Sequence, residues 1–116
     1  MTGAATNSEK FDEFHAGHPA VYDVLVRLAR EWVAATGRRK LGIATLYERA
    51  RWEIALETGD ADYKLNNNYR AYYARLVMYQ ERDLCDMFDM RWSEADEWIL
   101  YRIEADESRR DGTPAA

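Results

Sequence analysis

The chain has 116 residues, of which 47% are hydrophobic and 32% charged, with a formal net charge of −5. This length fits one domain, and the apolar content is enough for a core without disulfides or metals. Cys85 is the single cysteine, so no intrachain disulfide can form and a reducing, cytoplasmic location is expected. The sequence shows no secretory signal and no apolar run near the roughly 20 residues of a membrane span, so we expect no contact with a membrane.

The first third of the chain predicts two helices. Residues 1–7 have no hydrophobic periodicity and are expected to be disordered. Ser8 is expected to cap a short helix over residues 9–16. A longer helix is predicted from Pro19 to Thr36, because its apolar residues recur at three- and four-residue steps and Gly37 then breaks the pattern.

A third helix is predicted over residues 42–58, with Ile43, Leu46 and Ile54 on its core face. Trp52 and Leu56 are four residues apart on a different face and form a second apolar ridge. This ridge requires a second neighbour, either inside the domain or in a partner.

Residues 58–68 are rich in Gly, Asp and Asn and predict a loop, with one Asn side chain capping a fourth helix that ends near Gln80. This fourth helix is apolar nearly all round, which is typical of a helix that is buried or meets a partner. A short turn containing Leu84, Met87 and Phe88 follows.

Ser93 and Asp96 form a variant capping box that predicts a last helix, which Trp98, Ile99 and Ile103 dock against the core. From Ala105 onward, charge, Gly and Pro indicate a disordered tail. The sequence as a whole therefore predicts an all-α protein: a single compact bundle of about five or six helices over residues 8–104, with a disordered tail at 105–116.

Residues capable of catalysis or metal binding do not form a recognisable set. His15 and His18 are close in sequence, but Gly17 and Pro19 interrupt the helix around them, and a zinc site requires three or four rigidly held ligands. Cys85 stands among Asp residues that disfavour a thiolate, so we expect it to be a small core residue. We therefore expect no metal, no cofactor, no small-molecule substrate and no enzymatic activity.

Charge is distributed unevenly along the chain. Residues 37–76 carry eight cationic and five anionic side chains, whereas residues 77–116 carry five and eleven. Ion pairs between these segments are the favoured interpretation, but a basic central region also suits nucleic acid. The candidate contacts to nucleic acid are Arg38, Arg39, Lys40, Asn67, Arg70 and Arg75. The loop before the fourth helix is longer than that of a standard helix-turn-helix.

Apolar and aromatic residues exceed what one buried face per helix requires, and such residues are enriched in the cores of protein interfaces. The candidate interface residues are Trp52, Leu56, Met78, Tyr79 and Tyr101. They either fill a compact bundle or bind a partner, which would be a host protein or a second copy of the chain.

Three segments carry a resemblance: FHAGHPAVYDVLVRLA at 14–29, RWEIALETGD at 51–60 and KLNNNYRAYYARLVM at 64–78. They resemble a group of small proteins from bacteriophages, prophages and actinobacterial genomes, and the likeness spans about residues 11–92. The resemblance implies a phage or prophage origin and action inside the cell. It carries no activity and no catalytic residue.

The leading hypothesis is a non-enzymatic, phage-type accessory protein that binds a host or self partner through an apolar helical surface. The alternative is a nucleic-acid-binding regulator that uses the basic region. The two differ in their response to salt, because a phosphate-driven complex weakens as salt rises and an apolar interface does not.

Overall fold

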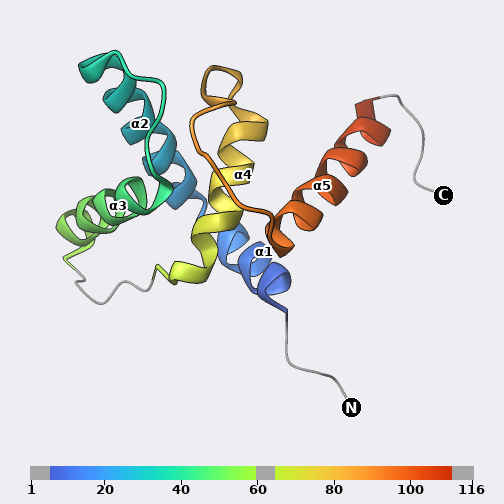
Figure 1. Ribbon diagram of the computed structural model, residues 1–116. Coiled ribbons are helices and arrows are strands. Elements are labelled where there is room, and N and C mark those ends of the chain that lie inside the picture. The colour runs from blue at the N-terminus through green and yellow to red at the C-terminus, as the bar shows by residue number, and fades with distance from the viewer. Residues whose placement is uncertain (1–5, 60–64, 111–116) are drawn as a thin grey trace.

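The computed structural model describes residues 6–59 and 65–110, which form five α-helices and no β-strand (Figure 1). The helices are α1 (Asn7–Gly17), α2 (Pro19–Thr36), α3 (Ile43–Thr58), α4 (Arg70–Gln80) and α5 (Glu94–Arg110). Two short 3₁₀ turns, η1 (Asn67–Tyr69) and η2 (Arg82–Leu84), precede and follow α4. The predicted all-α class is confirmed for these residues, and all five helices contribute to one hydrophobic core.

The start of α1 differs from the prediction in its cap. Thr6, not Ser8, is the N-cap, and its Oγ1 accepts a hydrogen bond from the amide of Glu9 at 3.1 Å. The Ser8 hydroxyl lies 3.1 Å from the hydroxyl of Tyr72 instead. Both residue types cap helices well, so the sequence did not separate them. Thr6 and Asn7 therefore belong to the start of a helix rather than to a disordered segment, and residues 1–5 lie outside the described ranges.

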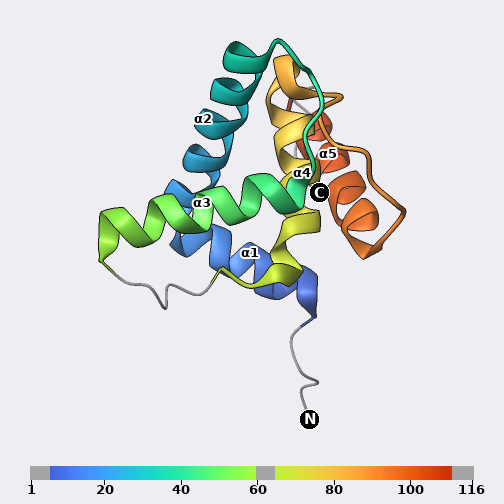
Figure 2. The ribbon, with the colours of Figure 1, turned by 60° about the vertical axis from the view of Figure 1, so that its left-hand side comes forward.

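The connection between α2 and α3 follows the predicted boundaries. α2 ends at Thr36, and Gly37 adopts a left-handed conformation with φ of 69°, which glycine accommodates without a steric penalty. The amide of Gly37 donates to the carbonyl of Val33 at 2.9 Å. Gly42 is then the N-cap residue of α3, which packs against α2 and lies across it in the view of Figure 2.

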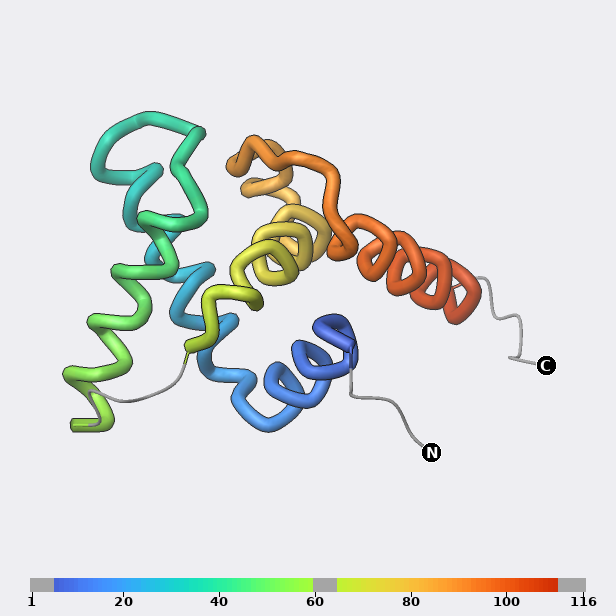
Figure 3. The backbone as a smooth tube through the Cα atoms, turned by 60° about the horizontal axis from the view of Figure 1, so that its bottom comes forward, coloured from blue at the N-terminus to red at the C-terminus, as the bar shows by residue number. Residues whose placement is uncertain are grey.

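Helix α4 is the central element. All side chains from Tyr72 to Val77 are buried, which confirms that a helix apolar nearly all round lies inside the bundle. Figure 3 shows α4 between α3 and α5, and it contacts α2 as well. Asn66 is the N-cap of η1, the turn that leads into α4: its side-chain oxygen accepts a hydrogen bond from the backbone amide of Asn68 at 2.8 Å.

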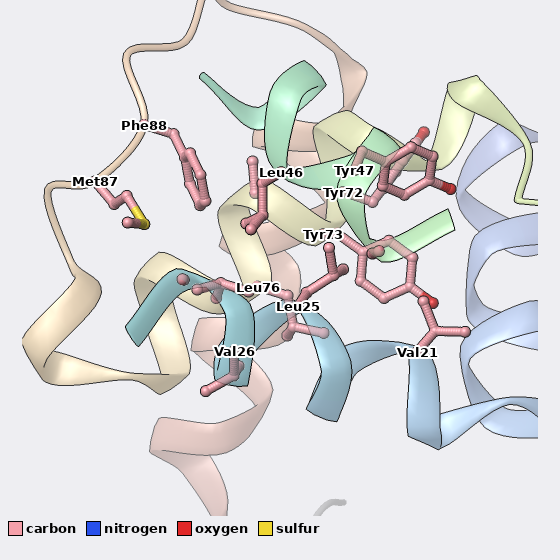
Figure 4. Packing of buried hydrophobic residues seen from close by; sticks show 14 of the residues in the cluster. Val21, Leu25, Val26, Leu46, Tyr47, Tyr72, Tyr73, Leu76, Met87 and Phe88 are labelled. Atoms are coloured by element: carbon pink, nitrogen blue, oxygen red, sulfur yellow. The ribbon is translucent and has the colours of Figure 1, made fainter. Parts of the chain in front are cut away.

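The core has two parts. Side chains of α2, α3, α4 and the segment after η2 point toward one another in one part, where Leu25, Leu46, Leu76 and Phe88 meet (Figure 4). The other part is aromatic. The ring of Phe11 is fully buried, and its centroid lies 4.8 to 5.1 Å from the ring centroids of Tyr72, Tyr73 and Trp98. Such ring pairs contribute about 1 kcal/mol each beyond the area they bury.

Helix α5 begins with the predicted capping box. The carboxylate of Asp96 accepts from the amide of Ser93 at 2.8 Å, and the hydroxyl of Ser93 accepts from the amide of Ala95 at 3.2 Å. The helix continues to Arg110, so residues 105–110 are helical where a disordered tail was expected. Good helix formers and the favourable cations Arg109 and Arg110 in the last turn account for the extension. Residues 111–116 of the expected tail lie outside the described ranges.

None of the helices in the described residues is long and apolar enough to cross a membrane.

Candidate functional site

Two of the three cations in the segment between α2 and α3 form ion pairs with other parts of the chain. Arg39 forms an ion pair with Asp86 at 2.8 Å, and Lys40 forms one with Asp89 at 2.9 Å. The hydrogen bond from Arg39 holds the pKa of the Asp86 carboxyl below its ordinary value. A backbone hydrogen bond joins the same two segments, because the amide of Leu41 donates to a backbone carbonyl in the segment that follows η2. These cations therefore face the acidic segment that follows α4, as the favoured interpretation of the charge pattern expects.

A second set of ion pairs ties α2 to the same acidic segment. Arg30 contacts Asp83 at 2.9 Å and Glu81 at 2.8 Å. Its hydrogen bond lowers the pKa of Asp83 from the ordinary value. Glu81 also accepts a hydrogen bond from the hydroxyl of Tyr22 at 2.7 Å, and burial is the main cause that raises the pKa of this phenol. The charges of residues 81–89 are thus largely used to join elements.

Arg75, one of the nucleic-acid candidates, is placed in the core by the structure. Its side chain is 4% exposed, and its guanidinium donates to the carbonyls of Ala71 and Arg91 at 3.0 and 2.7 Å and to the carboxylate of Asp96 at 2.8 Å. This residue fastens the loop before α5 to α4 and offers no group to an outside ligand. A guanidinium has several donors and can therefore satisfy all three acceptors at once. Helical spacing alone did not indicate that Arg75 would be buried in this way.

The remaining cationic candidates do not share one face. Arg38 is exposed in the segment after α2, whereas Arg70 begins α4 at the far end from the ion pairs with residues 86–89. The length of α4 separates these ends by about 15 Å at the rise of an α-helix. Asn67 is already engaged, since its side-chain oxygen accepts from Arg51 at 2.9 Å. An open basic surface that combines all six candidates is therefore absent from the described residues.

Helix α3 carries an exposed apolar pair. Trp52 is 60% exposed and Leu56 is 72% exposed, so the ridge seen in the sequence has no neighbour within the described residues. The guanidinium of Arg49 lies 5.5 Å from the centre of the Trp52 ring and pairs with Glu53 at 3.0 Å. The charges around the indole are thus satisfied within α3 itself.

An apolar hollow of about 340 Å³ lies between α2 and α3, one turn along α3 from Trp52. Its lining is Leu28, Glu31, Trp32, Leu41, Thr45, Leu46 and Arg49. Arg49 also lines a second hollow, which lies beside Trp52. The apolar hollow and the surface around Trp52 therefore adjoin. We call the surface formed by Trp52, Leu56 and this hollow the α3 face.

Met78 and Tyr79 lie on α4 and are not part of the α3 face. Both are half-buried and pack against the core. The hydroxyl of Tyr79 donates to the carboxylate of Asp106 at 2.8 Å, so it joins α4 to α5. The hydrogen bond to Asp106 is the main cause that raises the pKa of Tyr79.

Tyr101, the remaining interface candidate, is 74% exposed on α5, and its neighbour Leu100 is 56% exposed. Trp92, in the loop before α5, is 71% exposed. The sequence did not single out Leu100 or Trp92, although their positions outside the periodic core stripe were the available signal. The five candidates therefore divide into two exposed sets, on α3 and α5, and a half-buried set on α4.

The histidines do not form a metal centre. The described residues contain no group of three or more His, Cys, Asp or Glu side chains placed to hold an ion. His15 stacks on Phe11 with 5.7 Å between ring centroids, and burial, together with the charge of Arg102, lowers its pKa. His18 stacks on Phe14 at 4.4 Å. Both rings pack at the junction of α1 and α2.

Cys85 is exposed rather than buried. The turn after η2 points this small side chain outward, while Leu84 and Met87 on either side of it fill the core. The expectation of a core cysteine is therefore corrected, because spacing within a turn does not follow the helical period.

The fold and these surfaces define an all-α protein with exposed apolar helix faces. No protein-family model, no curated protein sequence and no solved structure matches the chain.

Proposed function

We propose that this chain is a non-enzymatic accessory protein that acts by binding another protein through the α3 face. The observation that carries the proposal is the exposure of Trp52 and Leu56, 60% and 72%, in a chain whose other helices keep most of their apolar residues in a filled core. The phage or prophage origin and the action inside a bacterial cell that the resemblance implies belong to the same proposal.

The physical argument is the free energy of apolar exposure. Burying a large apolar side chain contributes about 1.5 to 3 kcal/mol, and the folded chain leaves this contribution unused at both positions. Tryptophan is among the residues that most often dominate binding energy in protein interfaces. The charged residues next to Trp52 already have partners, so a bound protein would not leave them unpaired.

The alternative, nucleic-acid binding, has less support. Two of its candidate cations are paired with aspartates and a third is buried. Arg38 and Arg70 are the candidates for which the described residues show no ion pair, and they belong to separate elements: Arg38 follows α2, whereas Arg70 begins α4. Two separated cations supply little of the electrostatic free energy on which binding to phosphate depends.

The test is affinity capture from a bacterial host lysate, with and without nuclease and at rising salt. We expect the wild-type chain to retain a discrete protein that survives nuclease and high salt, because burial of apolar surface is not weakened by salt. The double variant Trp52→Ala with Leu56→Ala is expected to lose that protein. Its stability should change by no more than about 0.5 kcal/mol, because both side chains are exposed.

The matched control is the double variant Arg38→Ala with Arg70→Ala, which removes the two candidate cations that form no ion pair within the described residues and leaves the α3 face intact. It should retain the captured protein. Capture that disappears with nuclease, or that is lost in this control and kept in the Trp52 and Leu56 variant, would contradict the proposal and favour nucleic acid.

A further inference from the structure

The fully buried residues of α5 lie in its first half; farther along, Ile103 is partly buried against the core and Asp106 accepts the hydrogen bond from Tyr79. Ala95, Trp98 and Ile99 are buried, whereas beyond Ile99 no residue of α5 is buried. Figures 1 and 3 show the helix leading away from α4 toward its C-terminal end. One side of α5 therefore faces outward along most of its length.

The outward side is amphipathic in its own right. Residues 97, 100, 101, 104 and 107 are all exposed and have the spacing i, i+3, i+4, i+7 and i+10, so they lie along one stripe of the helix. Leu100 and Tyr101 are the apolar centre of this stripe. Glu97 precedes them by one turn, and Glu104 and Glu107 follow. We call these five residues the α5 face.

The carboxylates of the α5 face differ from those that hold the elements of the protein together. Asp83, Asp86, Asp89, Asp96 and Asp106 each pair with a cationic side chain. Glu97, Glu104 and Glu107 form no ion pair within the described residues. The three cations of the same helix have other partners: Arg102 lies over the ring of Trp98, Arg109 pairs with Asp106, and Arg110 contacts the hydroxyl of Tyr79. Along the stripe, the apolar pair is thus flanked by carboxylates that have no ion pair, whereas on its other side Tyr101 shares a hollow with Arg102 and Arg109.

This combination selects the chemistry of what covers the face. Nucleic acid and anionic membranes are repelled by three carboxylates, and a second α5 face would bring six of them together. A helix with an apolar stripe flanked by Lys or Arg satisfies both the apolar pair and the charges. The face extends about 15 Å along α5, which corresponds to about three turns of a packed helix.

We propose that the α5 face binds a basic amphipathic helix of a partner protein. This inference rests on the proposed function, protein binding, and assigns to it a second contact surface with stated chemistry. A contact of about three helical turns is smaller than a standard interface of about 800 Å² per partner, so on its own it binds in the micromolar range.

The experiment measures binding of labelled synthetic peptides to the full chain by fluorescence anisotropy. The first peptide has about 18 residues of Leu and Lys arranged to form one apolar helical stripe with a basic rim, a length at which a helix can form. The second peptide has the same composition with the stripe scrambled, and the third replaces every Lys by Glu. We expect the first to bind and the other two to bind at least about tenfold more weakly.

Charge reversal on the α5 face provides the specific readout. The double variant Glu97→Lys with Glu104→Lys should bind the basic peptide about tenfold more weakly than wild type and should bind the acidic peptide instead. The double variant Glu13→Lys with Glu57→Lys is the matched control, because it changes the net charge by the same amount on exposed positions of α1 and α3. It should leave the affinity for the basic peptide within about twofold.

Equal loss in both double variants would overturn the inference, since it would reveal only long-range attraction between an acidic protein and a basic peptide. Absence of basic-peptide binding at about 100 μM would also overturn it. If peptides fail to bind while the lysate capture depends on Trp52 and Leu56, the α5 inference alone is lost. If capture fails and the peptide result holds, the α3 assignment alone is lost.

Discussion

The sequence suggests that Arg75 contacts nucleic acid, whereas in the fold it is a buried structural residue. A cation in a segment rich in Asn and Tyr is typical of a surface that binds nucleic acid, yet this guanidinium is enclosed by α4, the loop after Met90 and the start of α5. The sequence does not indicate the difference, because the carbonyl of Arg91 and the carboxylate of Asp96 reach Arg75 only through tertiary packing. Local pattern predicts helix faces but not distant polar partners.

Replacement of Arg75 by Ala should lower the free energy of unfolding by about 2 to 3 kcal/mol. The variant leaves two carbonyls and the Asp96 carboxylate without their donor, and the 24% exposure of that carboxylate reduces the penalty below that of a fully buried pair. Urea unfolding with an unchanged m-value measures the effect. Arg38→Ala is the control at an exposed cation, and equal midpoints for the two variants would disprove the structural role of Arg75.

At the scale of elements, hydrophobic periodicity located the helices well. α2 begins and ends where Pro19 and Gly37 indicate, and α3 starts within one residue of its expected position. The errors fall where periodicity carries no information: the choice between Thr6 and Ser8 as the cap of α1, and the end of α5 at Arg110. An exposed last turn lacks apolar residues whether it is helical or not, so its sequence resembles that of a tail.

Gly37→Ala should lower the free energy of unfolding by about 1 kcal/mol. The cost arises from the left-handed conformation at φ of 69°, since an added Cβ meets no atom within 4 Å. Gly17→Ala is the matched control, because its site is equally open and its φ is not positive. The control should be neutral or slightly stabilising by thermal unfolding, as alanine is the better helix former. Equal destabilisation at both glycines would contradict this explanation.

At the scale of the whole molecule, ion pairs connect segments that are distant in sequence, and hydrophobic periodicity does not predict that these segments lie together. Arg30, Arg39 and Lys40 join α2 and the segment after it to residues 81–89. The excess of positive charge in the middle of the sequence and of negative charge at its end predicted such pairing in general. It did not predict which residues pair, because the geometry is set by the turn that η2 makes at the end of α4. For the exposed faces of α3 and α5, the sequence likewise indicated apolar residues outside the core stripe but not whether they are exposed, because residue spacing identifies a ridge and not what covers it.

These carboxylates should make the protein sensitive to acid. Hydrogen bonds from Arg30, Arg39 and Arg75 lower the pKa of Asp83, Asp86 and Asp96 below the ordinary value of 3.8. A depressed pKa in the folded state adds stability that is fully present above pH 3.8 and is lost as the pH falls through the folded-state values. The free energy of unfolding, measured by urea titration at a series of pH values, should therefore decline below about pH 4. Asp96→Asn should be less stable than wild type at neutral pH and should approach it in acid, and parallel curves would contradict the assignment.

The bond from the Trp98 indole to Asp12 joins positions 86 residues apart, beside the ring of Phe11. Detachment of either α1 or the first half of α5 opens the same aromatic cluster to water, so their backbone amides should exchange with deuterium as one cooperative unit. The turns of α5 beyond Ile103 take no part in that closure and should exchange earlier. Because the two partners are so far apart in the sequence, we expect this junction to form late in folding, after the intervening helices have assembled.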